Sequence, residues 1–410
     1  MGGLSPEVDP AAVGLDATRL SRLKSHFAAY VDDGRLPGFL ITVSRGGKLA
    51  YVAEYGCRDA EAGLPVTTDT IWRIYSMSKP VTSVAAMCLY EDGAFELTDP
   101  VSKFIPSFAD VRVFAGGSDI RCVTVPAVEP VRIWHLLTHT SGLTYGFHRS
   151  HPVDAMYRAA GFEWGTPRRT DLAANCDRWA SLPLLFQPGS EWNYSVSTDV
   201  LGRVIEVASG MALDSFFQQR IFGPLGMTET GFFVGPGERE RLAALYGVGP
   251  RRKAVRLDAM GYVADHRPTF LGGGGGLLST ASDYLRFTSM LLGEGSLDGV
   301  RVLSPRTVSF MLSNQLPGGA DLESFGRALF AESPFRGVGF GLGFAVVLNP
   351  ASGKILTGAG EASWGGAAST AFFVDRAAGL NVSFFTQLLP SSAHPIRSQL
   401  RQLVYQALTD

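Results

Sequence analysis

Apolar positions near the N-terminus recur first with a helical period and then with the period of a strand. Across residues 16–33 the apolar side chains fall on one helical face, bounded by Asp16 as N-cap and Gly34 as stop. Residues 39–43 and 49–53 then carry apolar side chains at every second position, and a Gly-Gly turn joins the two runs. This pattern predicts an amphipathic helix followed by a β-hairpin.

The middle of the chain has a different character. From about 95 to 265, proline-containing turns alternate with helix-like runs, and few stretches show a strand pattern. One helix is predicted after the turn that begins at Pro188, and another over residues 212–222. Residues 235–266 are rich in glycine, arginine and proline and are predicted to form a long surface excursion.

Strand patterns return after a glycine run at residues 272–276. A predicted helix over 281–293 is followed by three apolar, aromatic runs and by a final helix over 395–407. The three runs, each predicted to be a strand, are 340–348, 369–374 and 380–387. Two strands and a helix at one end of the chain, and three strands and a helix at the other, predict one antiparallel sheet built from both termini.

The predicted fold class is therefore α+β, with two domains. A sheet of about five strands, flanked by helices, is formed by residues 1–94 and 267–410, and residues 95–266 form a mostly helical inserted domain. The junction of two such domains is a common place for a ligand pocket.

Composition and charge narrow the classes of function. The 410 residues are 46% hydrophobic with a net charge of −2, which fits a globular protein and argues against nucleic acid or an anionic membrane as partner. The N-terminus shows neither a basic n-region nor an apolar h-region, and no apolar run approaches roughly 18 residues, so a cytoplasmic protein without a membrane span is expected. Four well-separated cysteines are expected to be reduced thiols: Cys57, Cys88, Cys122 and Cys176.

One stretch carries the strongest chemical signal. Ser76-Met77-Ser78-Lys79 follows an apolar, aromatic segment and opens a run with helical periodicity. Pro80 is tolerated in a first helical turn, so the helix is expected to begin at or just before Ser76, with Lys79 one turn on and facing the same side. A serine hydroxyl becomes a nucleophile when a base lies within reach, and lysine serves as that base when its neutral form is favoured.

Alone, this four-residue pattern also fits an ordinary helix start capped by Ser76 or Ser78. A serine–lysine pair needs a second proton relay and an oxyanion hole as well. Tyr194 lies in a turn entering a helix, where its phenol could shuttle a proton or simply pack. Residues 364–367, Trp-Gly-Gly-Ala, precede a predicted strand and could bring backbone close to a substrate or merely link two strands.

Taken in order, five segments resemble the serine β-lactamase and penicillin-binding-protein superfamily, whose nucleophile motif is S-x-x-K. The resemblance is closest to its esterase branch, the family VIII carboxylesterases related to class C β-lactamases, and spans residues from about 15 to 390. The five segments are 76–79, 135–143, 188–195, 221–227 and 274–280. The resemblance implies the β-lactamase-like two-domain fold and a serine hydrolase that uses no cofactor or metal.

The resemblance also implies a role for each matching residue. Ser76 is the expected nucleophile, and Lys79 and Tyr194 are expected to share the general base and acid work. The expected oxyanion hole consists of the backbone N–H groups of Ser76 and Ala367. The residues expected to line the substrate pocket are Tyr75, Trp364, Gly365 and Gly366.

Two departures from the β-lactamases bear on the substrate. Residues 364–366 read Trp-Gly-Gly where those enzymes have Lys-Thr-Gly, so the cation that helps hold a drug carboxylate is absent. Residues 194–196 read Tyr-Ser-Val where those enzymes have Tyr-x-Asn, so the asparagine that contacts the acylamide side chain is missing. Both changes favour neutral esters over β-lactams or peptides.

Other chemistries fit the sequence less well. The glycine run lacks the G-x-G-x-x-G pattern between a strand and a helix, and it is expected instead to let a loop run close to the site. His139 and Ser141 stand two residues apart and cannot readily fold onto each other, and the sequence has no G-x-S-x-G elbow. The histidines lack an H-E-x-x-H arrangement, which argues against a metal site.

The expected activity is hydrolysis of small-molecule carboxylic esters through an acyl-enzyme, with short acyl chains preferred and little β-lactam hydrolysis. Three alternatives stay open on the same scaffold: an acyltransferase, a β-lactamase or D-amino-acid peptidase, and a penicillin-binding-like receptor that acylates slowly or only binds. The natural ester, its enantiopreference and the oligomeric state are left open by the sequence.

Overall fold

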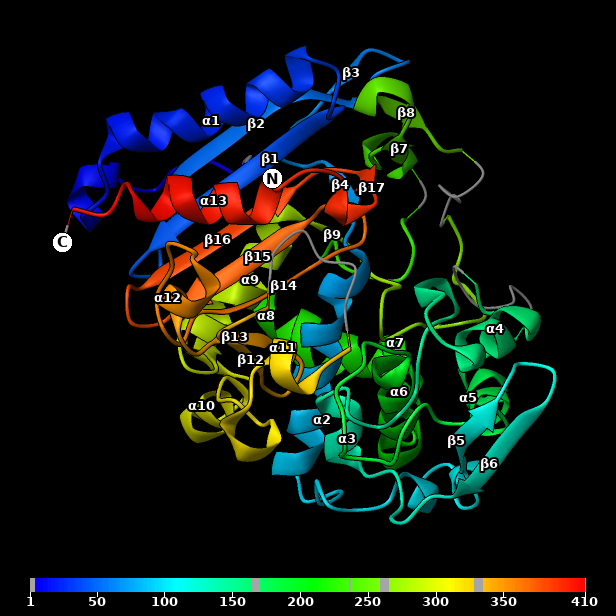
Figure 1. Cartoon of the computed structure of the whole chain (residues 1–410). Coiled ribbons are helices and arrows are strands. Elements are labelled where there is room, and N and C mark those ends of the chain that lie inside the picture. Colours follow the sequence, from blue (N-terminus) through cyan, green and yellow to red (C-terminus); the bar gives the residue numbers. More distant parts are fainter. Residues whose placement is uncertain (1–3, 164–169, 236, 259–264, 328–334, 410) are drawn as a thin grey trace.

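The computed structural model describes residues 4–163, 170–235, 237–258, 265–327 and 335–409. Its largest element is an antiparallel sheet of eight strands, coloured blue and orange in Figure 1. The strands are β1 (Gly38–Arg45), β2 (Lys48–Asp59), β3 (Leu64–Pro65), β12 (Val338–Phe340), β13 (Ala345–Val347), β14 (Ala362–Gly365), β15 (Ala371–Asp375) and β16 (Leu380–Phe385). Their order is β12-β13-β14-β15-β16-β1-β2-β3, so the two ends of the chain meet where β16 pairs with β1.

The α+β class and the sheet built from both termini are confirmed, but the sheet has eight strands where about five were predicted. The run 340–348 is a hairpin rather than one strand, because β12 and β13 flank a turn at Gly343, whose φ of +93° favours glycine. β14 was not predicted, since four residues offer too short an alternation to recognise. The edge strand β3 is shorter still.

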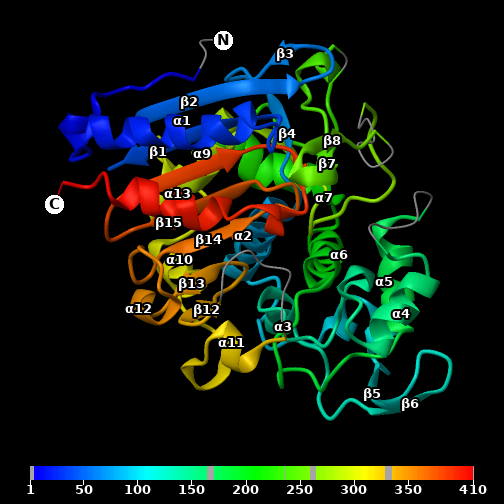
Figure 2. The same ribbon diagram turned by 45° about the horizontal axis from the view of Figure 1, so that its top comes forward.

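Helices cover both faces of the sheet. α1 (Ala17–Asp32) and α13 (Ile396–Tyr405) pack on one face, while α2 (Ser78–Glu91) and α9 (Ala281–Leu292) lie on the other (Figure 1, Figure 2). Alternate residues of β1 serve the two faces, as the pattern predicted: Ile41 packs with the α1 and α13 side chains, and Leu40 with those of α2 and α9. The predicted N-terminal helix, hairpin, 281–293 helix and C-terminal helix are confirmed.

The middle of the chain is largely helical. Its helices are α3 (Ile133–Leu137), α4 (Pro152–Ala159), α5 (Leu172–Ala180), α6 (Ser197–Ser209), α7 (Leu213–Phe217) and α8 (Gly223–Leu225). The predicted helix at 212–222 is α7 continued by a π-helical turn over Gln218–Phe222. A hairpin of β5 (Arg112–Gly117) and β6 (Cys122–Pro126) was not predicted, because its strands are mostly exposed and lack an apolar face. The division of the chain at residues 94 and 266 stays a prediction.

The predicted surface excursion at 235–266 is wrong for part of the described chain. β7 (Tyr246–Val248) pairs with β8 (Ala254–Arg256) and, in parallel, with β17 (Leu388–Leu389). Tyr246 is buried at this small sheet, and its hydroxyl donates to the Glu61 carboxylate. An isolated tyrosine amid glycines gave no periodic signal for that burial. Residues 236 and 259–264 lie outside the described residues.

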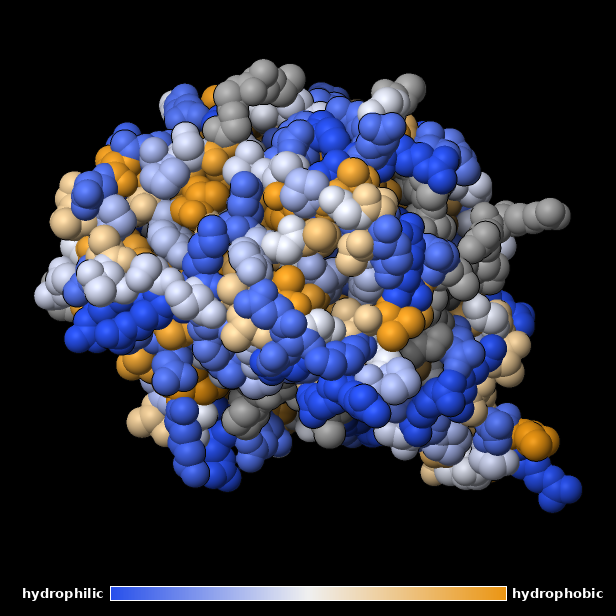
Figure 3. Space-filling model, turned by 90° about the horizontal axis from the view of Figure 1, so that it is seen from above, coloured by the Kyte–Doolittle hydropathy of each residue, from blue (hydrophilic) through white to orange (hydrophobic). Residues whose placement is uncertain are grey.

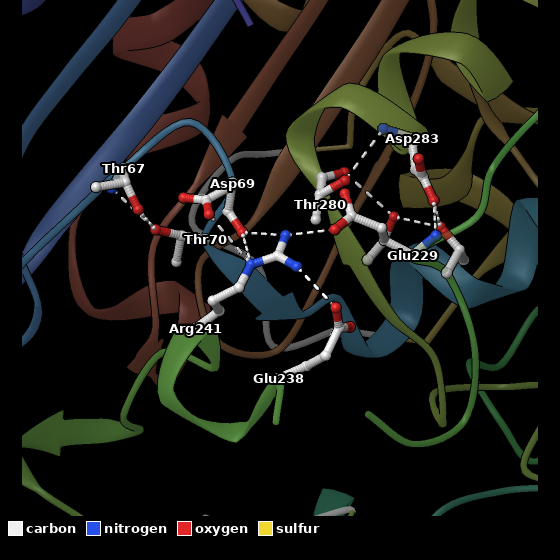
Figure 4. A network of polar contacts seen from close by, with 10 residues as sticks. Thr67, Asp69, Thr70, Glu229, Glu238, Arg241, Thr280 and Asp283 are labelled. Carbon is white, nitrogen blue, oxygen red and sulfur yellow. Dashed lines mark hydrogen bonds and ion pairs between the residues drawn. The ribbon is translucent and has the colours of Figure 1, made fainter. Parts of the chain in front are cut away.

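A two-stranded ladder leads the chain into Ser76. It pairs β4 (Ile71–Arg73) with β9 (Leu278–Thr280). The Arg241 guanidinium ion-pairs beside this ladder with three carboxylates from separate segments, as Figure 4 shows: Asp69, Glu229 and Glu238. Because one planar guanidinium joins these segments, it supports the position of the strand that precedes Ser76.

None of the helices in the described parts of the chain is both long and apolar enough to span a bilayer. The face shown in Figure 3 mixes hydrophilic residues with scattered hydrophobic ones. All four cysteines are free thiols.

Candidate active site

Ser76 lies at the junction between β4 and α2. It sits in a 3₁₀ turn, Tyr75–Met77, and the α-helix proper begins at Ser78. The predicted helical start at or just before Ser76 is therefore confirmed, with a tighter first turn than expected. Tyr75 adopts φ of 43°, a left-handed conformation that is uncommon for residues other than glycine. Such conformations persist where surrounding structure imposes them, often at functional sites.

Lys79 lies within hydrogen-bond distance of Ser76. Its Nζ is 3.2 Å from the Ser76 Oγ and donates a 2.6 Å hydrogen bond to the Gly274 carbonyl oxygen. The side chain is only 2% exposed. The structure thus brings together the two residues of the predicted pair, and the glycine run, a second segment, holds the lysine. That run comes close to the site, as predicted.

Tyr194 packs against the same lysine. Its ring centroid is 4.5 Å from the Lys79 Nζ, and its hydroxyl oxygen accepts a 3.3 Å hydrogen bond from the Trp364 Nε1. The Tyr194 carbonyl oxygen accepts a 2.7 Å hydrogen bond from the His148 Nε2, which fixes the turn that carries the phenol. The three predicted catalytic side chains therefore form one cluster.

His139 and Ser141 do not face each other. The His139 Nδ1 lies 3.2 Å from the Ser195 Oγ, while the Ser141 Oγ lies 2.8 Å from the Ser197 Oγ. Burial, with a smaller contribution from the Lys79 charge, lowers the pKa of His139 well below its ordinary value. A neutral imidazole packed beside Tyr194 supports that ring rather than forming a serine triad.

Two further residues of the cluster were missed by the sequence analysis. The Tyr145 ring centroid is 5.5 Å from the Lys79 Nζ, and burial raises the pKa of this phenol well above its ordinary value. Asp199, in the first turn of α6, is buried and accepts a hydrogen bond from the Gly274 N–H. Each stands close to a recognised segment, but a single tyrosine or aspartate carries no spacing signal.

The segment 364–367 approaches the nucleophile from the sheet. It precedes β15 as predicted, but Trp364 and Gly365 are the last residues of β14 rather than part of a loop. The Gly366 N–H donates to the Thr370 carbonyl at 2.9 Å, which closes the turn that follows. In the part of the chain that the structure describes, no hydrogen bond from the Ala367 N–H is formed, so this group is available to an oxyanion.

Both glycines of this segment are closely packed, but only at Gly366 would a Cβ meet backbone atoms, which cannot move aside as a side chain can. A Cβ on Gly365 would lie 2.3 Å from the Arg397 Nη2, and a Cβ on Gly366 would lie 2.5 Å from the Ile74 carbonyl oxygen. The Arg397 Nη2 also donates a 3.1 Å hydrogen bond to the Gly366 carbonyl oxygen. Gly366 thus lets the turn that carries Ala367 lie against the chain entering Ser76.

These elements surround one cavity of about 1510 Å³. All of the residues predicted to line the pocket or the oxyanion hole border it: Tyr75, Ser76, Trp364, Gly365, Gly366 and Ala367. The lining also includes four aromatic side chains that the sequence analysis did not single out: Phe147, Phe162, Trp179 and Phe270. The arrangement offers a serine with a buried amine beside it, two candidate oxyanion donors and a large, mostly apolar space.

Comparison with known proteins identifies the family of the chain. A family model described as Beta-lactamase matches residues 23–406. An uncharacterised protein of Mycobacterium tuberculosis is 40% identical over 366 residues, which cover 88% of each chain. Esterase EstB of Burkholderia gladioli is 33% identical over 416 residues, which cover 97% of this chain and 98% of EstB.

A solved structure extends the similarity to the whole fold. EstCE1, described as a hydrolase with promiscuous acyltransferase activity, matches with a TM-score of 0.78 at 27% identity, covering 95% of this chain and 98% of its own. These relatives support an ester hydrolase or acyltransferase, and hence a serine enzyme, on this scaffold. The chain therefore belongs to the β-lactamase family, in the esterase branch of the serine β-lactamase and penicillin-binding-protein superfamily.

Proposed function

We propose that the protein is a carboxylic ester hydrolase that works through an acyl-enzyme on Ser76, with Lys79 and Tyr194 moving protons. The observation that carries this proposal is the 3.2 Å approach of the Lys79 Nζ to the Ser76 Oγ beside the cavity. A base at that distance can take the hydroxyl proton as the oxygen attacks.

In the acylation half, the Ser76 Oγ attacks the ester carbonyl carbon while Lys79, in its neutral form, accepts the serine proton. The N–H groups of Ser76 and Ala367 donate to the oxyanion of the tetrahedral intermediate. When the C–O bond to the alcohol breaks, the Tyr194 hydroxyl gives its proton to the leaving oxygen and regains one from Lys79. Water then attacks the acyl-enzyme, loses a proton by the same route, and the Ser76 Oγ leaves protonated.

Short acyl groups are the proposed acyl substrates, because Trp364 forms a fixed apolar wall. Its ring centroid lies 5.4 Å from that of Tyr194 and 5.4 Å from that of Phe340, so the indole is held in an aromatic cluster. A neutral ester needs no cation at this position, whereas a β-lactam carboxylate does. The larger, aromatic part of the cavity then has room for the alcohol portion of the ester.

Acyl transfer is the second candidate, supported by the cavity size and by the description of EstCE1. A cavity of about 1510 Å³ can hold an acceptor alcohol beside an acyl group. Product analysis with p-nitrophenyl butyrate and an acceptor alcohol separates the two: free butyrate indicates hydrolysis, and a new butyrate ester indicates transfer.

The nucleophile is tested with Ser76→Ala and the control Ser78→Ala. Ser76→Ala should abolish both p-nitrophenyl butyrate hydrolysis and labelling by a fluorophosphonate probe. Ser78 is buried, and its Oγ accepts a hydrogen bond from the Leu277 N–H, so Ser78→Ala should keep most of the activity. Steady turnover that Ser76→Ala removes excludes a receptor that only binds or acylates once. Labelling of Ser78 or Ser141 would overturn the assignment.

A further inference from the structure

The proposed mechanism does not use Asp199, a buried carboxylate whose charge is felt by the Lys79 amine. Asp199 lies in the first turn of α6 and is 7% exposed. Its Oδ1 accepts a 2.9 Å hydrogen bond from the Gly274 N–H. An ionised carboxylate is costly to bury unless hydrogen bonds and an opposite charge compensate it. The position of Asp199 therefore requires an explanation.

Gly274 connects this carboxylate to the catalytic lysine. The Gly274 N–H points to Asp199, while the Gly274 carbonyl oxygen accepts the 2.6 Å hydrogen bond from the Lys79 Nζ. A Cβ on Gly274 would lie 2.6 Å from the Asp199 Oδ2, so only glycine allows the carboxylate this close. Asp199 thus fixes the residue that holds the lysine beside Ser76.

The charged and titratable groups around Asp199 come from four elements. Lys79 on α2 is the cation that faces it, Tyr145 and Tyr194 lie on the turns beside that lysine, and Cys176 lies on α5. Burial raises the pKa of Asp199, and the Lys79 charge opposes this rise. No direct ion pair joins the described side chains of Asp199 and Lys79. They are linked instead by their hydrogen bonds to Gly274 and by the electrostatic attraction between their charges.

We propose that Asp199 is a positioning residue for Lys79, which acts through Gly274 to hold the Nζ beside Ser76 and through its negative charge to favour the protonated amine. This inference rests on the proposed function of Lys79. Asp199 borders the cavity, but within the described residues its hydrogen bond goes to Gly274 and none joins it to Ser76, so its effect on the nucleophile is indirect. Its charge sets the pH above which Lys79 can accept the serine proton, and its hydrogen bond sets where the amine lies.

Two substitutions separate the charge from the hydrogen bond. Asp199→Asn keeps an oxygen that can accept the Gly274 N–H but removes the charge. The acidic limb of the kcat/KM profile for p-nitrophenyl butyrate should then move to lower pH by about one unit, with KM little changed. Asp199→Ala also loses the acceptor, and kcat should fall about 10- to 100-fold because the lysine is no longer held.

A matched control removes a buried carboxylate outside the site. Asp283 on α9 accepts the Glu229 N–H at 2.7 Å, much as Asp199 accepts the Gly274 N–H (Figure 4). Asp283→Asn should leave the pH profile of kcat/KM unchanged. Thermal melting of each variant checks that it folds. If Asp199→Ala does not fold, the pH profile of Asp199→Asn, which is nearly isosteric with the wild type, tests the inference alone.

A second readout does not depend on the ester chosen. The rate of Ser76 labelling by a fluorophosphonate, followed against pH, should show the same shift of its acidic limb in Asp199→Asn. If Ser76→Ala is inactive but Asp199→Asn keeps the wild-type pH profile in both assays, this inference is wrong and the proposed function stands. If Ser76→Ala retains wild-type hydrolysis, the proposed function itself fails.

Discussion

The Trp364 indole Nε1 donates a 3.3 Å hydrogen bond to the hydroxyl oxygen of Tyr194. In the proposed mechanism Trp364 therefore has a role beyond that of an apolar wall, because its N–H is bonded to the phenol that is to act as proton donor. Trp364 lies in β14 and borders the same cavity as Ser76, with its ring packed against that of Tyr194. We therefore expect substitutions at Trp364 to affect both proton transfer and substrate choice.

Trp364→Phe should lower kcat about 2- to 10-fold, since a neutral hydrogen bond is worth about 0.5–1.5 kcal/mol. The ring that walls the pocket is largely retained, so KM for p-nitrophenyl butyrate should change little. Steady-state kinetics at several pH values measure both constants. Unchanged kcat would mean that the indole N–H does not orient Tyr194.

Proton transfer is tested at Lys79 and Tyr194. Lys79→Ala and Tyr194→Phe should each reduce kcat by about 10²- to 10⁴-fold, because loss of a positioned acid or base typically costs that much. Thermal melting should show small changes for Tyr194→Phe, which removes one oxygen. Near-normal kcat in Tyr194→Phe would mean that another group transfers the proton. Tyr145, whose ring also lies near the Lys79 Nζ, would then be the next residue to test.

The close packing behind the oxyanion segment gives a backbone prediction. Gly366→Ala should cut kcat/KM at least tenfold, because its Cβ would lie 2.5 Å from the Ile74 carbonyl oxygen, a backbone atom that cannot move aside as a side chain can, so the turn that carries Ala367 must shift. Gly116→Ala is the control, since nothing lies within 4 Å of a Cβ built there. Equal activity of the two variants would show that this turn tolerates the displacement.

A buried histidine predicts how stability depends on pH. Burial, helped by the Arg132 charge, lowers the pKa of His135 to about 3 from 6.5. The unfolded chain then binds a proton below pH 6.5 that the native state does not, so stability is lost as pH falls from 6.5 towards 3. Between pH 6.5 and pH 5 this loss is about 2 kcal/mol.

Urea unfolding at pH 7 and pH 5 measures this effect. In His135→Gln, which cannot titrate, the difference in unfolding free energy between the two pH values should shrink by about 2 kcal/mol. His266→Gln, at a side chain that is 83% exposed, should behave like the wild type. The same pH dependence in His135→Gln and wild type would contradict the prediction.

The sequence predicts those parts of the site that lie on local structure. Ser76 and Lys79 are one helical turn apart, so their approach follows from the helix itself. Tyr194 and Ala367 come from distant segments, and only the resemblance to a known family connected them with Ser76. No periodicity in the chain indicates that β14 carries residue 364 to the phenol of residue 194.

Asp199 and Gly274 show why part of the site was missed. The glycine run was expected to approach the site, and it does, but its partner is a lone aspartate whose role depends on a tertiary contact. Tyr246 is similar: its burial depends on β7 pairing with β17, more than 100 residues along the chain. Such contacts leave no mark on the hydrophobic period of either segment.

The last prediction concerns the class of substrate, which we expect Trp364 to determine. A β-lactam carries a carboxylate, and a charged hydrogen bond to that group is worth about 1.5–3 kcal/mol. With an indole in the lysine position this contribution is lost, whereas a neutral ester loses nothing. We expect hydrolysis of p-nitrophenyl esters from about acetyl to hexanoyl, with kcat/KM for cephalosporins and penicillins lower by at least about tenfold. A kcat/KM for a cephalosporin equal to that for p-nitrophenyl butyrate would show that another group holds the carboxylate, and Trp364 would then not determine the substrate class.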